Sequence, residues 1–450
     1  MVKKAVLNYI EEHQEALVDF SSLLIQAKPI NPFFVGEMYS EKKVQSVFKA
    51  KFKELGLEVI EIPVDFDQLN DYAGSPGYTP GVTDTVSFEE RPNLLVRLPG
   101  TDPENAPSIL LSGHCDVVAA DDEDLWDFHP FEGVVSDGKL YGRGASDMLC
   151  GLSGMVYAME AIIKTGARPK GDIWFTSLIC EEYGGTGTLA VADWMKRTGL
   201  APDVVIMGEG TNSDYLSLVC RGITFVDVVV TGRAGHLERT PDHWTQGGAV
   251  DAIAKARYIM DSLDRLNADW SLREDKDHPL LNDPCQAKVS MIKGGHHPSS
   301  YAETCTLTID IQSLPHEQDE NYVPTSVKEE FTDFLMRVCQ ADPWLQDHPV
   351  DIQWKLDADC VEMSPDHPFV GLMSSVIEET NGGGSIKGET WHYDGGWFTN
   401  LLGSSVLAFG PGDIACAHGR NEFCFIRNLI DYTKIVALAC LGWCNTEKHG

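Results

Sequence analysis

Residues 108–151 have the sequence SILLSGHCDVVAADDEDLWDFHPFEGVVSDGKLYGRGASDMLCG. The apolar run Ile109–Leu111 predicts a buried strand that places His114 and Asp116 at the carboxyl edge of a sheet. Because side chains alternate along a strand, His114 and Asp116 share one face. A metal-binding histidine usually donates its second ring N–H to a carboxylate. The pair is therefore typical of a metal ligand and the residue that orients it.

Four more acids occur at positions where a sheet would gather them, one near the end of this stretch and three beyond it. Asp147 comes after a glycine-rich turn, Glu181 and Glu182 directly follow one apolar run, and Glu209 follows another. Open α/β sheets hold their sites at the carboxyl ends of the strands, so we expect these acids near His114. Each feature taken singly also suits an ordinary turn or helix start, and only their agreement favours a site.

The composition excludes several classes of protein. The chain has 450 residues, more than one hydrophobic core usually fills, and a formal net charge of −33. Such a charge repels nucleic acid and anionic lipid, so we expect neither a nucleic-acid nor a membrane partner. Acids interrupt the amino-terminal apolar pattern, and the twelve scattered cysteines suit reduced core thiols. These features predict a cytoplasmic protein.

The order of helical and strand patterns predicts an α/β fold with an insertion. Residues 1–216 alternate between the two patterns, which favours a mostly parallel sheet with helices on both faces. From 217 to 355, alternating β-branched strands with two helices predict an inserted α+β domain with an antiparallel sheet. Residues 356–450 return to the first pattern. We therefore expect one domain from 1–216 and 356–450 and a second from 217–355.

Six motifs occur in one order along nearly the whole chain: SGHCDVV, LYGRGASDM, EEYGGTG, MGEG, GRAGHLERTP and AHGRNE. This series resembles the M20 family of dinuclear zinc amidohydrolases and peptidases, which includes acetylornithine deacetylase, succinyl-diaminopimelate desuccinylase and dipeptidases. The resemblance implies a catalytic metal domain and an inserted lid and dimerisation domain.

The resemblance also implies five metal ligands. One metal would be held by His114 and Glu209 and the other by Glu182 and His418, with Asp147 bridging the two. Imidazole nitrogens and carboxylate oxygens suit zinc, cobalt or manganese. We therefore expect two divalent ions per chain, with zinc as the first choice.

Three further residues receive catalytic roles from the resemblance. Glu181 would be the general base, Asp116 would orient His114, and His236 would reach the active site of the partner subunit in a homodimer. The β-branched run 225–230 before His236 is expected to pair edge to edge with its symmetry mate. The alternative is that His236 is an exposed loop histidine near a helix start.

Departures from the family pattern bear on the substrate. Leu149 stands where the family usually has Lys, Ser299 where it commonly has Asn, and Gln312 where it usually has Arg. The family's Asn and Arg help to grip the substrate, so their absence argues against an ordinary amino acid with a free carboxylate. Residues 387–397 match a region that lines the family's pocket. Four cations could compensate: Arg221, Arg239, Lys387 and Arg420.

The leading hypothesis is metal-dependent hydrolysis of an amide bond in a small N-acylated amine or amino acid. The first alternative is exopeptidase action of the dipeptidase or carboxypeptidase type. A more distant alternative is a catalytically silent relative that binds a ligand. A silent relative would be expected to lose ligands or the base, and this chain retains all of them.

Overall fold

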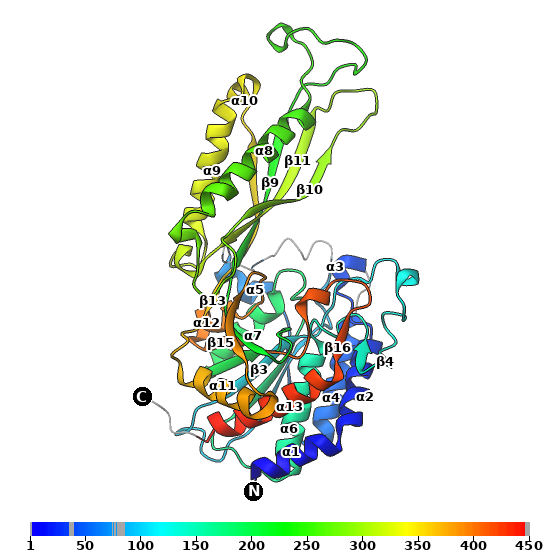
Figure 1. Cartoon of the computed structure of the whole chain (residues 1–450), viewed down its shortest axis with the longest axis vertical. Helices are drawn as coiled ribbons and strands as arrows, with labels where there is room; N and C mark the ends of the chain where they lie inside the picture. The colour runs from blue at the N-terminus through cyan, green and yellow to red at the C-terminus, as the bar shows by residue number, and fades with distance from the viewer. Residues whose placement is uncertain (1, 36–39, 74, 76–77, 79–85, 446–450) are drawn as a thin grey trace.

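The computed structural model describes residues 2–35, 40–73, 75, 78 and 86–445, and its main element is a nine-stranded sheet (Figure 1). The strands are arranged in the order β1-β2-β6-β3-β7-β15-β8-β13, and β14 also pairs with β8. The bounds are β1 Val59–Ile62, β2 Asn93–Leu98, β3 Ile109–His114, β6 Ile173–Leu178, β7 Val204–Met207, β8 Tyr215–Cys220, β13 Val361–Glu362, β14 Ser385–Glu389 and β15 Ser405–Ala408.

The centre of this sheet is parallel and its flanks are antiparallel. Strands β6, β3, β7 and β15 run parallel to one another, whereas β1, β2 and β13 pair antiparallel. Parallel neighbours need a crossover connection, and helices α6 (Leu149–Lys164) and α7 (Thr186–Thr198) supply two of these. The carboxyl ends of β3, β6 and β7 therefore meet at one edge, as the sequence predicts.

Two hydrophobic cores cover the two faces of the sheet, which confirms the predicted α/β architecture. Within β3, Leu111 belongs to one core and its neighbour Leu110 to the other. Because both faces are covered, the strand reads as a continuous apolar run rather than an alternation. On the Leu111 side lie α1 (Val2–Glu12), α2 (Gln14–Gln26), α4 (Ser40–Glu54), α6, α11 (Pro368–Asn381) and α13 (Ile426–Trp443), and on the other side lie α5 (Phe66–Leu69), α7 and α12 (Gly396–Leu402).

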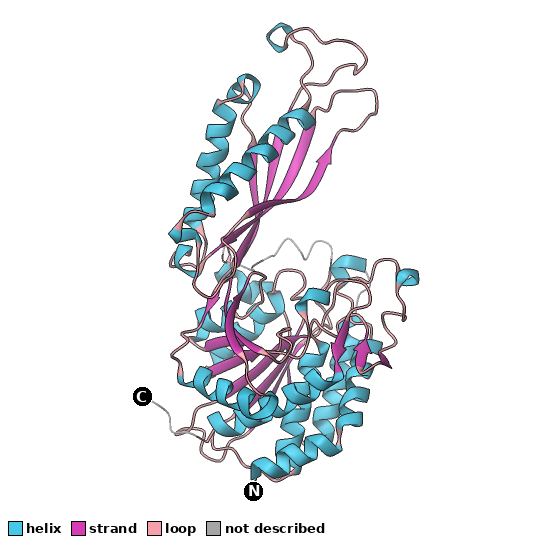
Figure 2. Ribbon diagram, in the orientation of Figure 1, coloured by secondary structure: helices cyan, strands magenta, loops and turns pink. Residues whose placement is uncertain are grey.

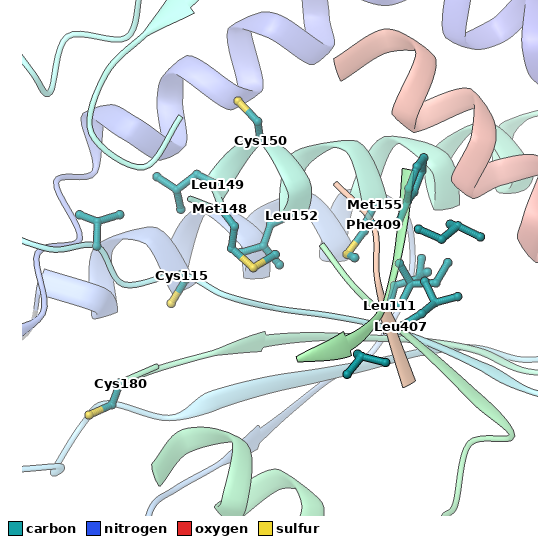
Figure 3. Close-up of a cluster of buried hydrophobic side chains, with 14 of the residues drawn as sticks. Leu111, Cys115, Met148, Leu149, Cys150, Leu152, Met155, Cys180, Leu407 and Phe409 are labelled. Atoms are coloured by element: carbon teal, nitrogen blue, oxygen red, sulfur yellow. The ribbon is translucent and has the colours of Figure 1, made fainter. Parts of the chain in front are cut away.

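Helix α6 packs closely on the sheet because glycines stand at the contact. Figure 3 shows Met148 and Leu111 in the cluster between this helix and the strands. A Cβ at Gly113 would lie 2.0 Å from Cε of Met148, and one at Gly151 would lie 2.2 Å from the carbonyl oxygen of Gly208. These approaches explain the glycines of the SGH, CG and MGEG segments. They hold the start of α6, which follows Asp147, against the ends of β3 and β7.

A separate antiparallel sheet stands away from the larger one (Figures 1 and 2), with helices α8 (Ala252–Trp270) and α9 (Thr325–Gln340) on one face. Its strands fall within residues 222–358. The predicted boundaries of an inserted domain, at residues 217 and 355, stay a prediction. The order is β10 (Ala287–Gly294), β11 (Thr304–Ser313), β9 (Gly222–Thr231) and β12 (Asp351–Ala358).

The expectation that residues 225–230 form an exposed edge is wrong. These residues belong to β9, which pairs with β11 on one side and with β12 on the other. Its backbone groups are therefore used within the chain, and β10 and β12 are the edges of this sheet. On β10, the side chains of Met291 and Ile292 are 63% and 57% exposed.

A small third sheet joins two of the sequence motifs. Strand β16 (Phe423–Phe425) pairs with β5 (Lys139–Tyr141), which pairs with β4 (Val134–Ser136). This pairing brings the loop of His418 beside the glycine-rich turn that precedes Asp147.

All twelve cysteines lie in the described part of the chain, none forms a disulfide, and only Cys416 is not fully buried. Within the described residues, every helix is too short or too polar to cross a membrane.

Candidate metal centre

Six side chains from different motifs converge at the carboxyl edge of the large sheet. His114 ends β3, Glu181 and Glu182 follow β6, and Glu209 follows β7. Asp147 comes from the turn before α6, and His418 comes from the loop between β15 and β16. Five of them form two groups that share His114, one with Glu181 and Glu209 and one with Asp147 and Glu182, and the possible ligand atoms of each group lie within 4.8 Å of one another.

Three acids surround the ring of His114. Its Nε2 lies 3.0 Å from Oδ1 of Asp147, 3.8 Å from Oε2 of Glu181 and 3.9 Å from Oε1 of Glu209. The side chain of His114 is buried, with only 1% of its surface exposed. Three acids around one buried nitrogen form an arrangement that a cation would stabilise.

Two of the acids also lie beside the ring of His418. Its Nε2 lies 3.0 Å from Oε2 of Glu182 and 3.3 Å from Oδ2 of Asp147. The two oxygens of Asp147 therefore face different histidines, Oδ1 toward His114 and Oδ2 toward His418. A carboxylate in this position is suited to bridge two ions.

Asp116 supports the site with two different groups. Nδ1 of His114 is 2.9 Å from the Asp116 carbonyl oxygen, to which it donates, and 3.7 Å from the carboxylate. The carboxylate instead accepts from the backbone N–H of Glu181 and of Glu182, each at 3.2 Å, and from Nδ2 of Asn31 at 2.7 Å. The carbonyl thus directs Nε2 of His114 toward the cluster of acids, and the carboxylate holds the Glu181–Glu182 turn.

Glu422 is a supporting residue that the sequence reasoning missed. One of its carboxylate oxygens accepts from the backbone N–H groups of Gly144, Ser146 and Asp147 at 3.1, 2.9 and 3.2 Å. The other pairs with Nη1 of Arg143 at 2.5 Å, and both side chains are buried. Glu422 therefore fixes the turn that carries Asp147. Its place in the AHGRNE motif was the available signal.

Burial and close contacts shift the pKa values of the residues in the cluster. Burial raises the pKa of Glu182 to about 7 and that of Glu209 to about 8, and neighbouring carboxylates add to both shifts. Hydrogen bonds with Asp147 and Glu182 raise the pKa of His418 to about 10. Burial alone would raise the pKa of Asp147, but hydrogen bonds from His114 and His418 outweigh it and lower that pKa.

The residues present fit two divalent ions. Oε1 of Glu182 and Oε1 of Glu209 are buried and have no hydrogen-bond partner. An unpartnered buried carboxylate oxygen is costly, and a bound cation removes that cost. Two imidazoles and several carboxylates match the nitrogen and oxygen donors that zinc, cobalt and manganese prefer.

The raised pKa values of two acids predict how the stability of the metal-free chain depends on pH. The pKa values of Glu182 and Glu209 are higher in the folded chain than the ordinary value of 4.5, so both acids bind protons more tightly when the chain is folded. This stabilises the fold at low pH, and the contribution disappears as the pH rises through about 7 to 8. We expect chemical denaturation of metal-free protein to give a lower free energy of unfolding at about pH 9 than at about pH 5.

The double variant Glu182→Gln/Glu209→Gln is the control for this pH dependence. It should show a smaller decrease over the same range, because amides do not titrate. A metal-free wild type whose stability rises with pH would contradict the account of these two acids.

A pocket of about 200 Å³ opens onto the candidate metal centre. Its described lining contains no lysine or arginine. The lining residues are Asp147, Glu181, Glu182, Glu209, Trp391, His392, Ile414, Ala417 and His418.

The residues that depart from the family pattern, and the cations that could compensate for them, are not among the described residues that line this pocket. Leu149 is fully buried in the core. Gln312 accepts a hydrogen bond from Nη1 of Arg221 at 2.9 Å, which ties that buried cation to the second sheet. The ammonium of Lys387 lies 4.3 Å from the ring centre of Tyr215. Arg239 and Arg420 are exposed.

Of the predicted site residues, only His236 lies away from the cluster within one chain. It is exposed, in the segment between β9 and α8 at the end of the four-stranded sheet remote from β3 (Figure 1). It forms an isolated bridge with Ser300, and the next residue, Leu237, donates to the carbonyl oxygen of Ser299 at 2.8 Å. The departure at Ser299 is thus beside His236.

Comparison with known proteins agrees with this geometry. Residues 110–441 match Peptidase family M20/M25/M40. The chain belongs to this family. The matched range of this M20 chain includes every residue of the metal cluster. M20 enzymes hydrolyse amide C–N bonds with metal ions, so the chain is a metal-dependent hydrolase of such bonds.

Two curated relatives and one solved structure illustrate the likeness of this M20 chain. An N-formyl-4-amino-5-aminomethyl-2-methylpyrimidine deformylase from Halalkalibacterium halodurans is 29% identical over 380 residues, which cover 80% of this chain and 85% of that protein. The deformylase of the same name from Bacillus subtilis is 26% identical, with 98% and 97% covered. The structure of a di-peptidase from Saccharomyces cerevisiae matches with a TM-score of 0.72, 17% identity and 99% of both chains covered.

Proposed function

We propose that this M20 enzyme removes a formyl or other short acyl group from a small amine that carries no carboxylate. The observation that carries the proposal is the lining of the pocket, which presents four acids and, within the described residues, no lysine or arginine. A substrate carboxylate there would find no lysine or arginine side chain to pair with. Both curated relatives described above are named for removal of a formyl group from an aminomethylpyrimidine.

The size of the pocket supports a small substrate. Its volume of about 200 Å³ lies below the roughly 300–1,000 Å³ usual for ligand pockets. Formyl is the smallest acyl group, so it leaves most of this space to the amine. Ser299 and Gln312, which replace the family's carboxylate-gripping Asn and Arg, support the same conclusion.

Two zinc-class ions would be held by five residues in the proposed site. His114 and Glu209 would hold one and Glu182 and His418 the other, and Asp147, whose two oxygens face the two histidines, would serve both. Bound divalent ions supply Lewis-acid polarisation of an amide carbonyl and make water more acidic.

Glu181 is the proposed general base. Its carboxylate lines the pocket, and burial raises its pKa well above the ordinary value, with Asp394 and Glu209 adding to the shift. A carboxylate of raised pKa accepts the proton of the attacking water and can then donate it to the departing amine. The Asp116 carboxylate positions Glu181 by accepting a hydrogen bond from the backbone N–H of Glu181.

A substrate panel tests the proposed reaction. Metal-loaded protein is incubated with N-formyl-4-amino-5-aminomethyl-2-methylpyrimidine, N-acetylornithine, N-succinyl-diaminopimelate and a set of dipeptides. We expect formate release from the first compound and a much lower kcat/KM for those with a free carboxylate. Efficient cleavage of the dipeptides or of either N-acyl amino acid, with no formate release, would overturn the proposed substrate class.

Metal analysis tests the ligand assignment. We expect about two zinc-class ions per chain in the wild type and about one in His418→Ala, because that variant lacks one of the five ligands. His129→Ala is a matched control, since His129 is also partly exposed and beside an acid, Glu123, but lies outside the cluster. Equal stoichiometry in His418→Ala and wild type would contradict the assignment of His418.

We further propose a cytoplasmic homodimer joined through the four-stranded sheet. The exposed Met291 and Ile292 on edge strand β10 suit an isologous contact with a second copy. The position of His236 at the remote end of that sheet supports its action in the partner's active site, where it would stabilise the developing oxyanion. The reduced cysteines support the proposed location.

A further inference from the structure

The wall of the pocket contains two ring side chains that the proposed reaction does not use. Trp391 and His392 belong to the connection between β14 and α12, and both line the pocket together with Glu181 and Glu209. The other lining residues outside the metal cluster, Ile414 and Ala417, are small or aliphatic. Trp391 therefore offers the one large flat surface among the described lining residues.

Trp391 is held as a fixed surface. It is partly buried and packs against the core on the α7 and α12 side of the sheet. Its ring centre lies 5.6 Å from that of the fully buried Tyr393, at an interplanar angle of 56°. One part of the indole thus rests on the core while another borders the pocket, so little side-chain freedom remains to be lost on binding.

His392 lies beside Asp394, which ties this segment to the turn that carries the proposed base. Its Nε2 lies 3.8 Å from Oδ1 of Asp394, and Oδ2 of Asp394 accepts from the hydroxyl of Thr188 at 2.8 Å. Thr188 is in the first turn of α7, directly after the Glu181–Glu182 turn. A Cβ at Gly185 would lie 2.6 Å from Oδ1 of Asp394, so the two segments are in close contact. The ring wall therefore has a defined position relative to the reacting amide.

We infer that Trp391 and His392 are specificity residues that recognise the amine part of the substrate as a planar ring with a polar edge. Trp391 stacks on the face of the ring, and His392 forms a hydrogen bond with a ring nitrogen or an amino substituent. Stacked aromatic pairs gain free energy beyond the burial of their area, and an aliphatic chain does not. This inference rests on the proposed function, because it names the amine of that same reaction.

Three N-formyl amines of similar length separate the two roles. N-formyl-4-amino-5-aminomethyl-2-methylpyrimidine has a ring and a polar edge, N-formylbenzylamine has the ring alone, and N-formylhexylamine has neither. Formate release is measured for wild type, Trp391→Leu, Trp391→Phe and His392→Phe. Trp194→Leu is the matched control, because Trp194 is also partly buried against the same core but does not line the pocket.

We expect Trp391→Leu to lower kcat/KM by about tenfold or more for both ring substrates and to leave N-formylhexylamine within about twofold of wild type. Trp391→Phe should retain most of the activity on rings. His392→Phe should lower kcat/KM for the pyrimidine alone, because benzylamine offers no partner for the lost hydrogen bond. Trp194→Leu should change none of the three.

The inference and the proposed function fail in different ways. Equal losses on all three substrates in Trp391→Leu and His392→Phe, in variants that melt like wild type, would overturn the inference and leave deformylation intact. Release of formate from none of the three by metal-loaded wild type would overturn the proposed function and, with it, the substrate recognised by these rings.

Discussion

Glu181→Gln is expected to keep both metal ions and to lose about 10²- to 10⁴-fold in kcat. The amide has nearly the shape of the carboxylate, so the backbone hydrogen bond from Glu181 to Asp116 and the packing of the turn should persist. What the amide cannot do is accept the proton of the attacking water. The measurement combines metal analysis with formate release from the formylated pyrimidine.

Glu182→Gln is the matched comparison, because Glu182 is the adjacent residue in the same turn and its N–H also donates to Asp116. Its Oε2 lies 3.0 Å from His418, and it is proposed as a ligand, so this change should weaken metal binding and be partly restored by excess zinc. Glu181→Gln should gain nothing from excess zinc. If the two phenotypes were exchanged, the base and the ligand would have been assigned to the wrong residues.

Mixing two inactive variants is expected to restore activity if His236 acts in the partner subunit. Glu181→Ala and His236→Ala homodimers should each be nearly inactive, since every site lacks either the base or the oxyanion donor. In a mixed dimer, one site carries both lesions, and the other has an intact Glu181 and an intact His236 from the opposite chain. Each mixed dimer should therefore reach about half of wild-type activity if the sites are independent.

The control for this experiment uses two lesions that belong to the same chain's site in either case. Glu181→Ala mixed with His114→Ala should recover nothing, because His114 and Glu181 come from one chain. Demonstrated subunit exchange without recovery in the Glu181→Ala and His236→Ala mixture would mean that His236 acts within its own chain or has no role in catalysis.

Much of the fold could be predicted from local sequence patterns. The continuous apolar runs of β3, β6 and β7 indicated strands covered on both faces, and their polar ends indicated a common edge. What the patterns could not show was which strands lie beside β9. Alternating β-branched residues indicate a strand with two different faces, and they are the same whether its edges are free or paired. The edge prediction for 225–230 failed for that reason.

The candidate site could be predicted in part. The residues that end strands, such as His114 and Glu209, lie together because parallel strands share an edge, and that follows from the sequence order. The contacts of Asp116 could not be predicted, since its carbonyl and carboxylate serve different partners. The place of Trp391 in the pocket was expected only through the family resemblance of residues 387–397, and Glu422 was missed although it stands in the AHGRNE motif. Both depend on the return of the chain after the inserted segment, and no local spacing gives that return. The roles of these residues stay proposals that the variants above test.

The most direct test of the central claim is a metal titration of the metal-free chain with formate release as the readout. Zinc is added in steps to wild type, and hydrolysis of N-formyl-4-amino-5-aminomethyl-2-methylpyrimidine is followed at each step. A two-metal deformylase predicts no hydrolysis at the start and a rise that reaches its plateau at about two ions per chain. Full activity without metal would contradict the account, and so would the absence of formate release at every zinc concentration.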